Sequence, residues 1–163
     1  MSQLRVSVHV DAPPDHVWEA LSDISTHVQW MADAESILFT SESTAGVGTT
    51  FECRTVVGPL ATVDLMEITV WEPPRRMGVR HSGVVTGTGE FHLEAAGSGT
   101  TFTWEEDLRF PWWAGGPLTG AAAVPVLRRV WTGSLRRFAG LVENGELPVP
   151  RDVSPPASGT AAG

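Results

Sequence analysis

The sequence predicts an α+β domain in which an antiparallel sheet packs against one long C-terminal helix. Apolar residues recur at helical spacing between Leu118 and Val142, whereas most of the chain before them alternates apolar and polar residues as strands do. A helix with one broad apolar face needs a large apolar surface to pack against, and the strands provide it. Antiparallel strands with helices gathered on one side define the α+β class.

The C-terminal helix is bounded by recognisable signals. It follows the segment Trp112–Pro117 and ends at Asn144–Gly145, where glycine takes the position that commonly follows a helix end. Pro125 has no N–H and clashes with the carbonyl four residues earlier, so we expect a kinked or two-part helix, divided into 118–124 and 126–143. The apolar face of the second part consists of Leu127, Val130, Trp131, Leu135, Phe138, Leu141 and Val142.

The chain before this helix is predicted to form one strand, two short helices and six further strands. Leu4–Val10 alternates apolar and polar residues, which is typical of a half-buried strand. Asp11–Asp15 opens a helix with proline in its first turn, and a second short helix runs from Asp23 through Trp30. The six further strands are expected at 36–41, 49–57, 61–72, 77–82, 84–95 and 100–110, separated by turns that contain glycine or proline.

Composition and charge narrow the class of protein. The 163 residues are enough for one domain, residues 1–146, followed by a tail, 147–163, whose Pro, Gly, Ala and Ser content predicts disorder. The net charge of −8 argues against a nucleic-acid partner. Cys53 is the single cysteine, which fits a reducing compartment. Because no apolar run approaches the ~20 residues of a membrane span, we expect no stable membrane insertion. We therefore expect a cytoplasmic protein, either a monomer or a weak homodimer.

Glu106 is the most notable polar residue of the predicted sheet. Residue parity places it on the apolar face of the last strand, together with Phe102, Trp104, Leu108 and Phe110. A buried carboxylate without a partner would have a raised pKa and could act as a general acid or base. Alternatively, a bulge turns Glu106 outward, or an arginine at the mouth of a cavity pairs with it.

The turn at Gly97–Ser98 predicts which residues face this strand. It places Phe91 opposite Trp104, Gly89 opposite Glu106, and Gly87 opposite Leu108. Two positions without side chains beside an inward carboxylate leave room for a ligand or water.

Three further polar residues have two interpretations each. His81 shares parity with Met77 and Val79, which predicts an inward side chain, but its place beside the Gly83 turn also fits a histidine at the rim. Cys53 shares parity with Phe51 and either packs in the core or lines a cavity. Ser134 either faces the cavity or bonds to the carbonyl one turn earlier.

Several segments resemble the polyketide cyclase/dehydrase and lipid-transport family of the START-like (SRPBCC) superfamily, which has the helix-grip fold. The segments lie between Leu4 and Glu143 and are Val10–Leu21, Asp23 to Trp30, Gly48–Phe51, Trp71–Arg76 and Thr101–Glu106. The resemblance implies a curved seven-stranded antiparallel sheet around the C-terminal helix, with a deep apolar cavity between them. Cyclases of this kind usually place arginine and tyrosine inside the cavity, whereas this sequence has no tyrosine and its Arg54 alternates outward.

The leading hypothesis is that the protein binds a hydrophobic small molecule, such as a lipid or polyketide, without a metal or other cofactor, since no metal-ligand or phosphate-loop motif occurs. One alternative is a cyclase/dehydrase that uses Glu106, alone or together with His81, as general acid and base; another is a co-chaperone-like interaction module. We expect a gate at Trp112, Trp113, Leu118 and Pro125, because two adjacent tryptophan rings should cover the cavity or meet a partner. The expected cavity residues are Phe51, Cys53, Met77, Val79, Gly87, Gly89, Phe91, Phe102, Trp104, Leu108, Leu127, Trp131, Ser134 and Phe138.

Overall fold

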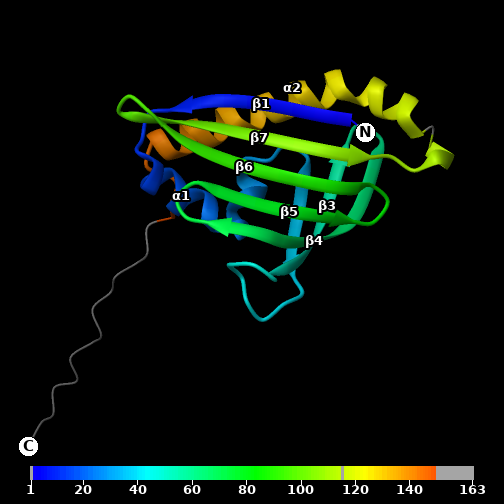
Figure 1. Cartoon of the computed structure of the whole chain (residues 1–163), viewed down its shortest axis with the longest axis horizontal. Coiled ribbons are helices and arrows are strands. Elements are labelled where there is room, and N and C mark those ends of the chain that lie inside the picture. Colours follow the sequence, from blue (N-terminus) through cyan, green and yellow to red (C-terminus); the bar gives the residue numbers. More distant parts are fainter. Residues whose placement is uncertain (1, 115, 150–163) are drawn as a thin grey trace, which may run out of the picture.

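A computed structural model describes residues 2–114 and 116–149, whose strands form one curved antiparallel sheet (Figure 1). The order of the seven strands is β1-β7-β6-β5-β4-β3-β2, so β1 and β2 are the edges. The strands are β1 (Ser2–Val10), β2 (Ala34–Phe39), β3 (Thr50–Val57), β4 (Leu60–Glu72), β5 (Arg76–Ser82), β6 (Thr86–Ala96) and β7 (Gly99–Arg109). The predicted helix-grip architecture is confirmed.

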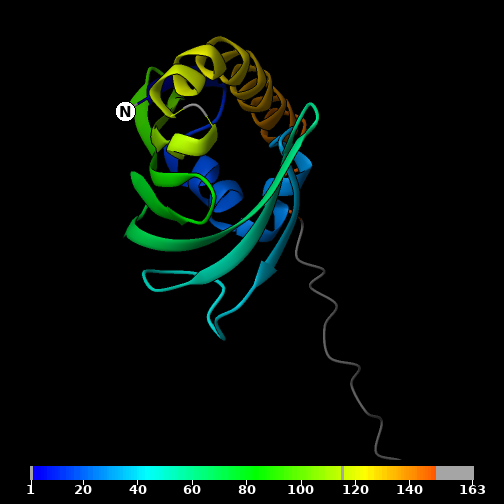
Figure 2. The ribbon, with the colours of Figure 1, turned by 90° about the vertical axis from the view of Figure 1, so that its right-hand side faces the viewer.

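The helices lie on the concave side of the sheet. The α-helix α1 (Pro14–Ser22) and the 3₁₀ helix η1 (Ile24–Gln29) connect β1 to β2, as the sequence predicts. A short 3₁₀ turn, η2 (Trp112–Ala114), leads into the long helix α2 (Gly116–Glu143), which packs against β1 and β7. Figure 2 shows how the sheet curves around a space that α2 covers from one side.

The helix α2 is continuous, so of the two alternatives at Pro125 the two-part helix is wrong. Pro125 lies inside the helix and is exposed. Its missing N–H leaves the carbonyl of Ala121 without a helical donor, and Ala121 is exposed as well. Water can therefore satisfy that carbonyl, and the turns on either side keep their own hydrogen bonds. The helix ends as predicted: Gly145 has φ of 74°, and the N–H of Glu146 donates to the carbonyl of Leu141 at 2.8 Å.

The core is built around Trp30, which follows η1 and is 1% exposed. Its ring packs between the sheet and α2, with centroids 6.2 Å from Phe102 and Trp104 and 5.1 Å from Phe138. One large aromatic side chain therefore fills one end of the space that the sheet encloses. Leu147, which the sequence assigns to the tail, is fully buried and belongs to this domain; the expected disorder of 150–163 lies outside the described residues.

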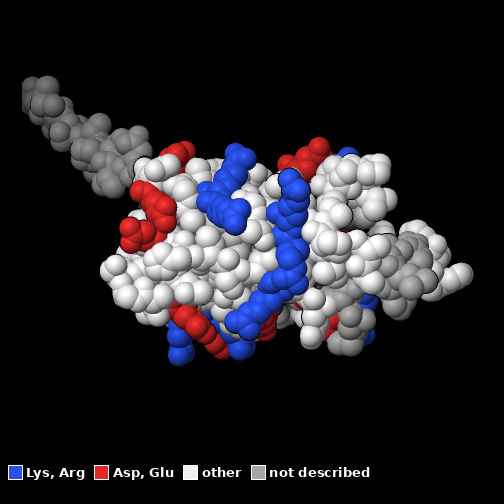
Figure 3. Space-filling model, turned by 90° about the horizontal axis from the view of Figure 1, so that it is seen from above, with Lys and Arg blue, Asp and Glu red and all other residues white. Residues whose placement is uncertain are grey.

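The face seen in Figure 3 carries charges of both signs. Basic side chains form one compact group and one band that crosses the face, and acidic side chains lie mainly near its edges. No helix of the described residues has both the length and the apolar character that crossing a membrane requires.

Candidate functional site

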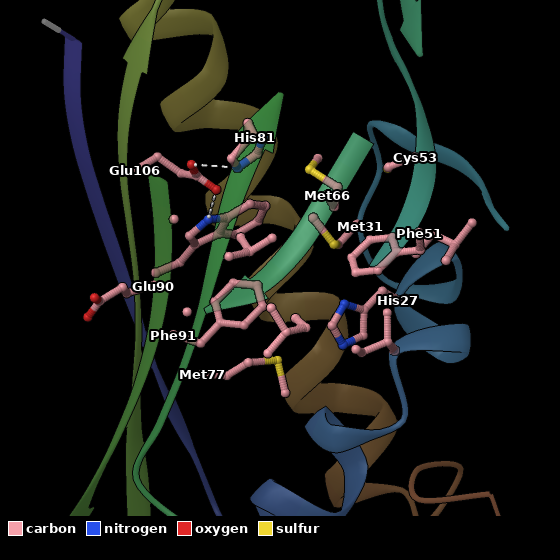
Figure 4. A pocket seen from close by; sticks show the side chains of 17 residues that line it. His27, Met31, Phe51, Cys53, Met66, Met77, His81, Glu90, Phe91 and Glu106 are labelled. Carbon is pink, nitrogen blue, oxygen red and sulfur yellow. Dashed lines mark hydrogen bonds and ion pairs between the residues drawn. The ribbon is translucent and has the colours of Figure 1, made fainter. Parts of the chain in front are cut away.

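Two adjoining cavities lie on the concave side of the sheet. The larger, of about 320 Å³, extends from the sheet to α2 and has mostly apolar walls, including Met31, Leu108, Phe110, Leu127 and Trp131. The smaller, of about 60 Å³, adjoins it (Figure 4). Six residues line both cavities: Met31, Cys53, Met66, His81, Trp104 and Glu106.

The polar centre of the site is an ion pair between His81 and Glu106. Nε2 of His81 lies 3.1 Å from Oε2 of Glu106, and the two side chains are 14% and 4% exposed. The other carboxylate oxygen, Oε1, accepts a hydrogen bond of 2.9 Å from Nε1 of Trp104. Figure 4 shows His81 and Glu106 pointing toward each other at one end of the smaller cavity. Both side chains therefore face inward.

The strand between these two residues makes their contact possible. His81 is on β5 and Glu106 on β7, and the intervening strand β6 presents Gly87 opposite His81 and Gly89 opposite Glu106. A β-carbon on Gly89 would lie 2.6 Å from Cδ of Glu106, so any side chain at this position would force the carboxylate to move. The predicted register is confirmed at all three positions, but the room beside Gly89 is occupied by the carboxylate of Glu106 and that beside Gly87 by the backbone of Asp107, rather than left open.

A second buried carboxylate, that of Asp33, also accepts a hydrogen bond from a tryptophan, in this case one on α2. Asp33 lies between η1 and β2, is 7% exposed, and its Oδ2 accepts a hydrogen bond of 2.9 Å from Nε1 of Trp131 on α2. The rings of Trp131 and Trp104 stack with centroids 4.5 Å apart and planes at 18°. Two stacked indoles thus each donate to a different buried carboxylate, Trp104 to Glu106 and Trp131 to Asp33.

Electrostatics couple the titratable groups of the site. Burial lowers the pKa of His81, but attraction to Glu106, followed by Asp64 and Asp33, outweighs it, and the net pKa is raised. Burial raises the pKa of Asp33, against the hydrogen bond from Trp131, which lowers it. Burial also raises the pKa of Cys53 to about 11, so its thiol stays protonated at neutral pH.

Most of the predicted cavity residues line one of the two cavities. Those on the larger cavity include Leu108, Leu127 and Trp131, and those on the smaller one are Phe51, Met77, Val79, Gly89 and Phe91. Cys53 and Trp104 line both and are also buried in the core.

Four predicted cavity residues line neither cavity. Phe102 and Phe138 pack against each other, with centroids 5.1 Å apart, and against Trp30, which occupies the space that they were expected to face. Ser134 donates to the carbonyl of Val130 and accepts from the N–H of Ala32, both at 3.0 Å. Gly87 lies by the outer hollow near Arg80 and Arg109.

Three of the four residues expected to form a gate, Trp112, Trp113 and Pro125, line neither of the two cavities. The side chains of Trp112 and Trp113 are 86% and 66% exposed, and neither lines a cavity, because η2 holds them beyond the end of β7. The side chain of Leu118 lies outside the described residues. The larger cavity reaches Leu60 and Val126, which are 70% and 51% exposed, so its mouth lies between the β3–β4 hairpin and the first half of α2.

Sequence reasoning missed Asp33 and Asp64 as members of the site. Asp64 alternates with Met66 and Ile68 on β4, and this parity could have identified it as inward-facing. Asp33 lies in an irregular connection, where no periodicity indicates the direction of a side chain. Among the residues that the structure describes, no group of three or more His, Cys, Asp or Glu side chains is arranged to hold a metal ion.

Fold and cavity together define a helix-grip protein with a mostly apolar interior and a few buried polar groups. Residues 1–143 match the family described as polyketide cyclase / dehydrase and lipid transport, and the chain belongs to this family. No curated protein matches the sequence significantly.

Solved structures support the same fold at low sequence identity. A Thermus thermophilus protein is 17% identical with a TM-score of 0.74, covering 88% of this chain and 98% of its own. The Zhui aromatase/cyclase of a Streptomyces species is 19% identical with a TM-score of 0.68, covering 87% and 93%. The di-domain ARO/CYC StfQ of the steffimycin biosynthetic pathway is 11% identical with a TM-score of 0.72, covering 89% of this chain and 51% of its own.

Proposed function

We propose that this protein binds a hydrophobic small molecule, of lipid or polyketide type, in the cavity of about 320 Å³ between the sheet and α2. The observation that carries the proposal is the cavity itself: pockets of about 300 Å³ or more with apolar walls and a few polar groups are typical of small-molecule sites. Family membership supports the same class of ligand.

The proposed route of access runs past the first half of α2 rather than under the two tryptophans. Ala123, Val126 and Leu127 from this half line the cavity opposite Val57 and Leu60 of the β3–β4 hairpin. An outward movement of either element would widen the mouth. Limited proteolysis should then cut residues 112–125 more slowly when a ligand is bound, whereas identical cleavage with and without ligand would contradict this gate.

A change that fills the cavity tests the proposed function. Ala123 lines the cavity, whereas Ala122, its neighbour on the same helix, is exposed. Ala123→Phe should weaken binding of the neutral dye N-phenylnaphthylamine, followed by its fluorescence, at least about tenfold, and Ala122→Phe should leave it unchanged. Equal binding by both variants would mean that the dye does not occupy this cavity. Native mass spectrometry of protein purified from its own cells would identify the natural ligand class.

A second candidate function is acid–base catalysis in the same cavity, as in a cyclase or dehydrase. The observation that favours it is the buried contact between His81 and Glu106, because such a pair can hold and pass a proton. Glu106→Gln separates the two functions. A carrier keeps most of its affinity for the dye, whereas an enzyme loses turnover of a poly-β-ketone analogue while binding it normally.

A further inference from the structure

Asp33 has one carboxylate oxygen whose hydrogen-bonding capacity is unused. The residue lines the larger cavity and is 7% exposed. Its Oδ2 accepts from Trp131, but its buried Oδ1 has no partner among the described residues. Buried polar atoms in native proteins nearly always have a partner, so an orphaned oxygen beside a cavity indicates a group that comes from outside the chain.

The other two carboxylates on the cavity have either a hydrogen bond or a charge partner at each oxygen. Asp64 accepts from the N–H of Val84 at 2.8 Å and from the hydroxyl of Thr62 at 2.9 Å. Oε1 of Glu106 accepts from Trp104, and Oε2 makes no hydrogen bond but lies 3.1 Å from the imidazole of His81, which can carry the opposite charge. Oδ1 of Asp33 is therefore the carboxylate oxygen on this cavity with neither a hydrogen bond nor a charge partner among the described residues, and a polar group of a ligand can bond to it.

The charges around the cavity decide which polar group fits. Three carboxylates, Asp33, Asp64 and Glu106, line it together with one histidine, and no arginine among the described residues does. A ligand carboxylate would be placed among like charges with no guanidinium to pair with it, which is costly in a buried site.

A hydroxyl group avoids this problem. It can both donate and accept, so it bonds to Asp33 whether that carboxyl is ionised or protonated. Burial raises the pKa of Asp33, so its carboxyl stays protonated to a higher pH than an exposed aspartate does. A hydroxyl group of a ligand can bond to either protonation state.

We infer that Asp33 is a specificity subsite for the hydroxyl group of an otherwise apolar ligand, such as a phenol or an alcohol, and that the cavity discriminates against carboxylates. The inference rests on the proposed function and deepens it, because it names the class of ligand that the same cavity selects.

Three ligands of one shape test the inference on the full chain. Naphthol, methylnaphthalene and naphthoate differ only in a hydroxyl, a methyl and a carboxylate, and calorimetric titration gives the affinity of each. Naphthol should bind about tenfold more tightly than methylnaphthalene, as one added buried hydrogen bond provides, and naphthoate should bind most weakly. Equal affinities for naphthol and methylnaphthalene, or tightest binding of naphthoate, would overturn the inference.

Two variants test whether Asp33 is the source of the preference for naphthol over methylnaphthalene. Asp33→Leu should bind naphthol no more tightly than methylnaphthalene, while Thr55→Val, which removes another polar group of the same cavity, should keep the wild-type preference. A preference that survives in Asp33→Leu would overturn the assignment to Asp33. Retained binding of methylnaphthalene shows that each variant is folded.

A measurement on the wild-type protein does not depend on how Asp33→Leu folds. Trp131 donates its indole N–H to the same carboxyl, so naphthol should shift the nuclear magnetic resonance signal of this N–H more than methylnaphthalene does. Equal shifts would count against the subsite. If none of the three ligands binds, the proposed function fails and the inference fails with it, whereas equal binding of naphthol and methylnaphthalene overturns the inference alone.

Discussion

Nε2 of His81 reaches Oε2 of Glu106, 3.1 Å away, across a whole strand. The two residues belong to β5 and β7, and β6 between them has Gly89 opposite Glu106. A side chain at Gly89 would displace the carboxylate of Glu106 from its present position beside the imidazole. The ion pair therefore depends on a glycine that does not take part in it.

The first prediction concerns the pKa of His81, which attraction to Glu106 helps to raise. Glu106→Gln removes this attraction and leaves burial, which lowers the pKa, so the pKa of His81 should fall relative to the wild type. Titration of the imidazole signals by nuclear magnetic resonance measures the change. Glu67→Gln, which removes the exposed partner of Arg80, is the control and should leave His81 unaffected. An unchanged pKa in Glu106→Gln would show that the two groups are not coupled.

The same coupling predicts how stability depends on pH. Because the folded-state pKa of His81 is raised above 6.5, its contribution to stability is fully present below pH 6.5 and is lost as the pH rises through the folded-state value. Denaturant unfolding above pH 6.5 should show this loss in the wild type and less of it in Glu106→Gln. A steeper loss in the variant would contradict the sign.

The second prediction concerns the space at Gly89. Gly89→Ala forces the carboxylate of Glu106 to move, and overpacking of this kind should lower the free energy of unfolding by about 1–3 kcal/mol. It should also move the pKa of His81 in the same direction as Glu106→Gln does. Gly133→Ala on α2, where a β-carbon meets nothing within 4 Å, should instead stabilise the protein by about 0.5–1 kcal/mol. Equal effects of the two changes would contradict the packing argument.

The third prediction concerns Ser134, whose hydroxyl connects α2 by a hydrogen bond to the segment after η1. Ser134→Ala leaves the N–H of Ala32 without its acceptor, and the loss of this partner should cost about 1–3 kcal/mol in chemical denaturation. Ser22→Ala, whose exposed hydroxyl only bonds to the carbonyl of Glu19, should change stability by less than about 0.5 kcal/mol. A neutral Ser134→Ala would mean that water replaces the hydroxyl.

The fourth prediction concerns acid stability. Burial lowers the pKa of His27 from 6.5 to about 4, although its hydrogen bond to the carbonyl of Leu21 opposes the shift. Between these two values the unfolded chain binds a proton that the folded chain does not, so stability falls as the pH falls from 6.5 toward 4, by about 3 kcal/mol in all. His27→Gln should flatten this part of the stability profile, and His9→Gln at an exposed position should not. An unaltered profile in His27→Gln would assign the acid sensitivity to other groups.

Several features of the site follow from local sequence patterns. The two-residue period of β7 placed Glu106 with Trp104 and Leu108, and the turn at Gly97 placed Gly89 opposite Glu106. The helical period likewise identified Trp131 and Leu127 on the inner face of α2. Each of these inferences needs only the chain near one strand, one hairpin or one helix.

What the sequence by itself determined is therefore the α+β class, the faces of most elements and the pairing of β6 with β7. Only the tertiary structure decided that His81 contacts Glu106 across β6 and that Asp33 accepts a hydrogen bond from Trp131. It also decided that Trp30 excludes Phe102 and Phe138 from the cavity. The exposure of Trp112 and Trp113 was likewise decided by the tertiary structure. Periodicity reports which face of its own element a residue occupies, because it arises from backbone geometry. It carries no information on which side chains from distant or irregular segments fill the same space, because packing in the folded protein decides that.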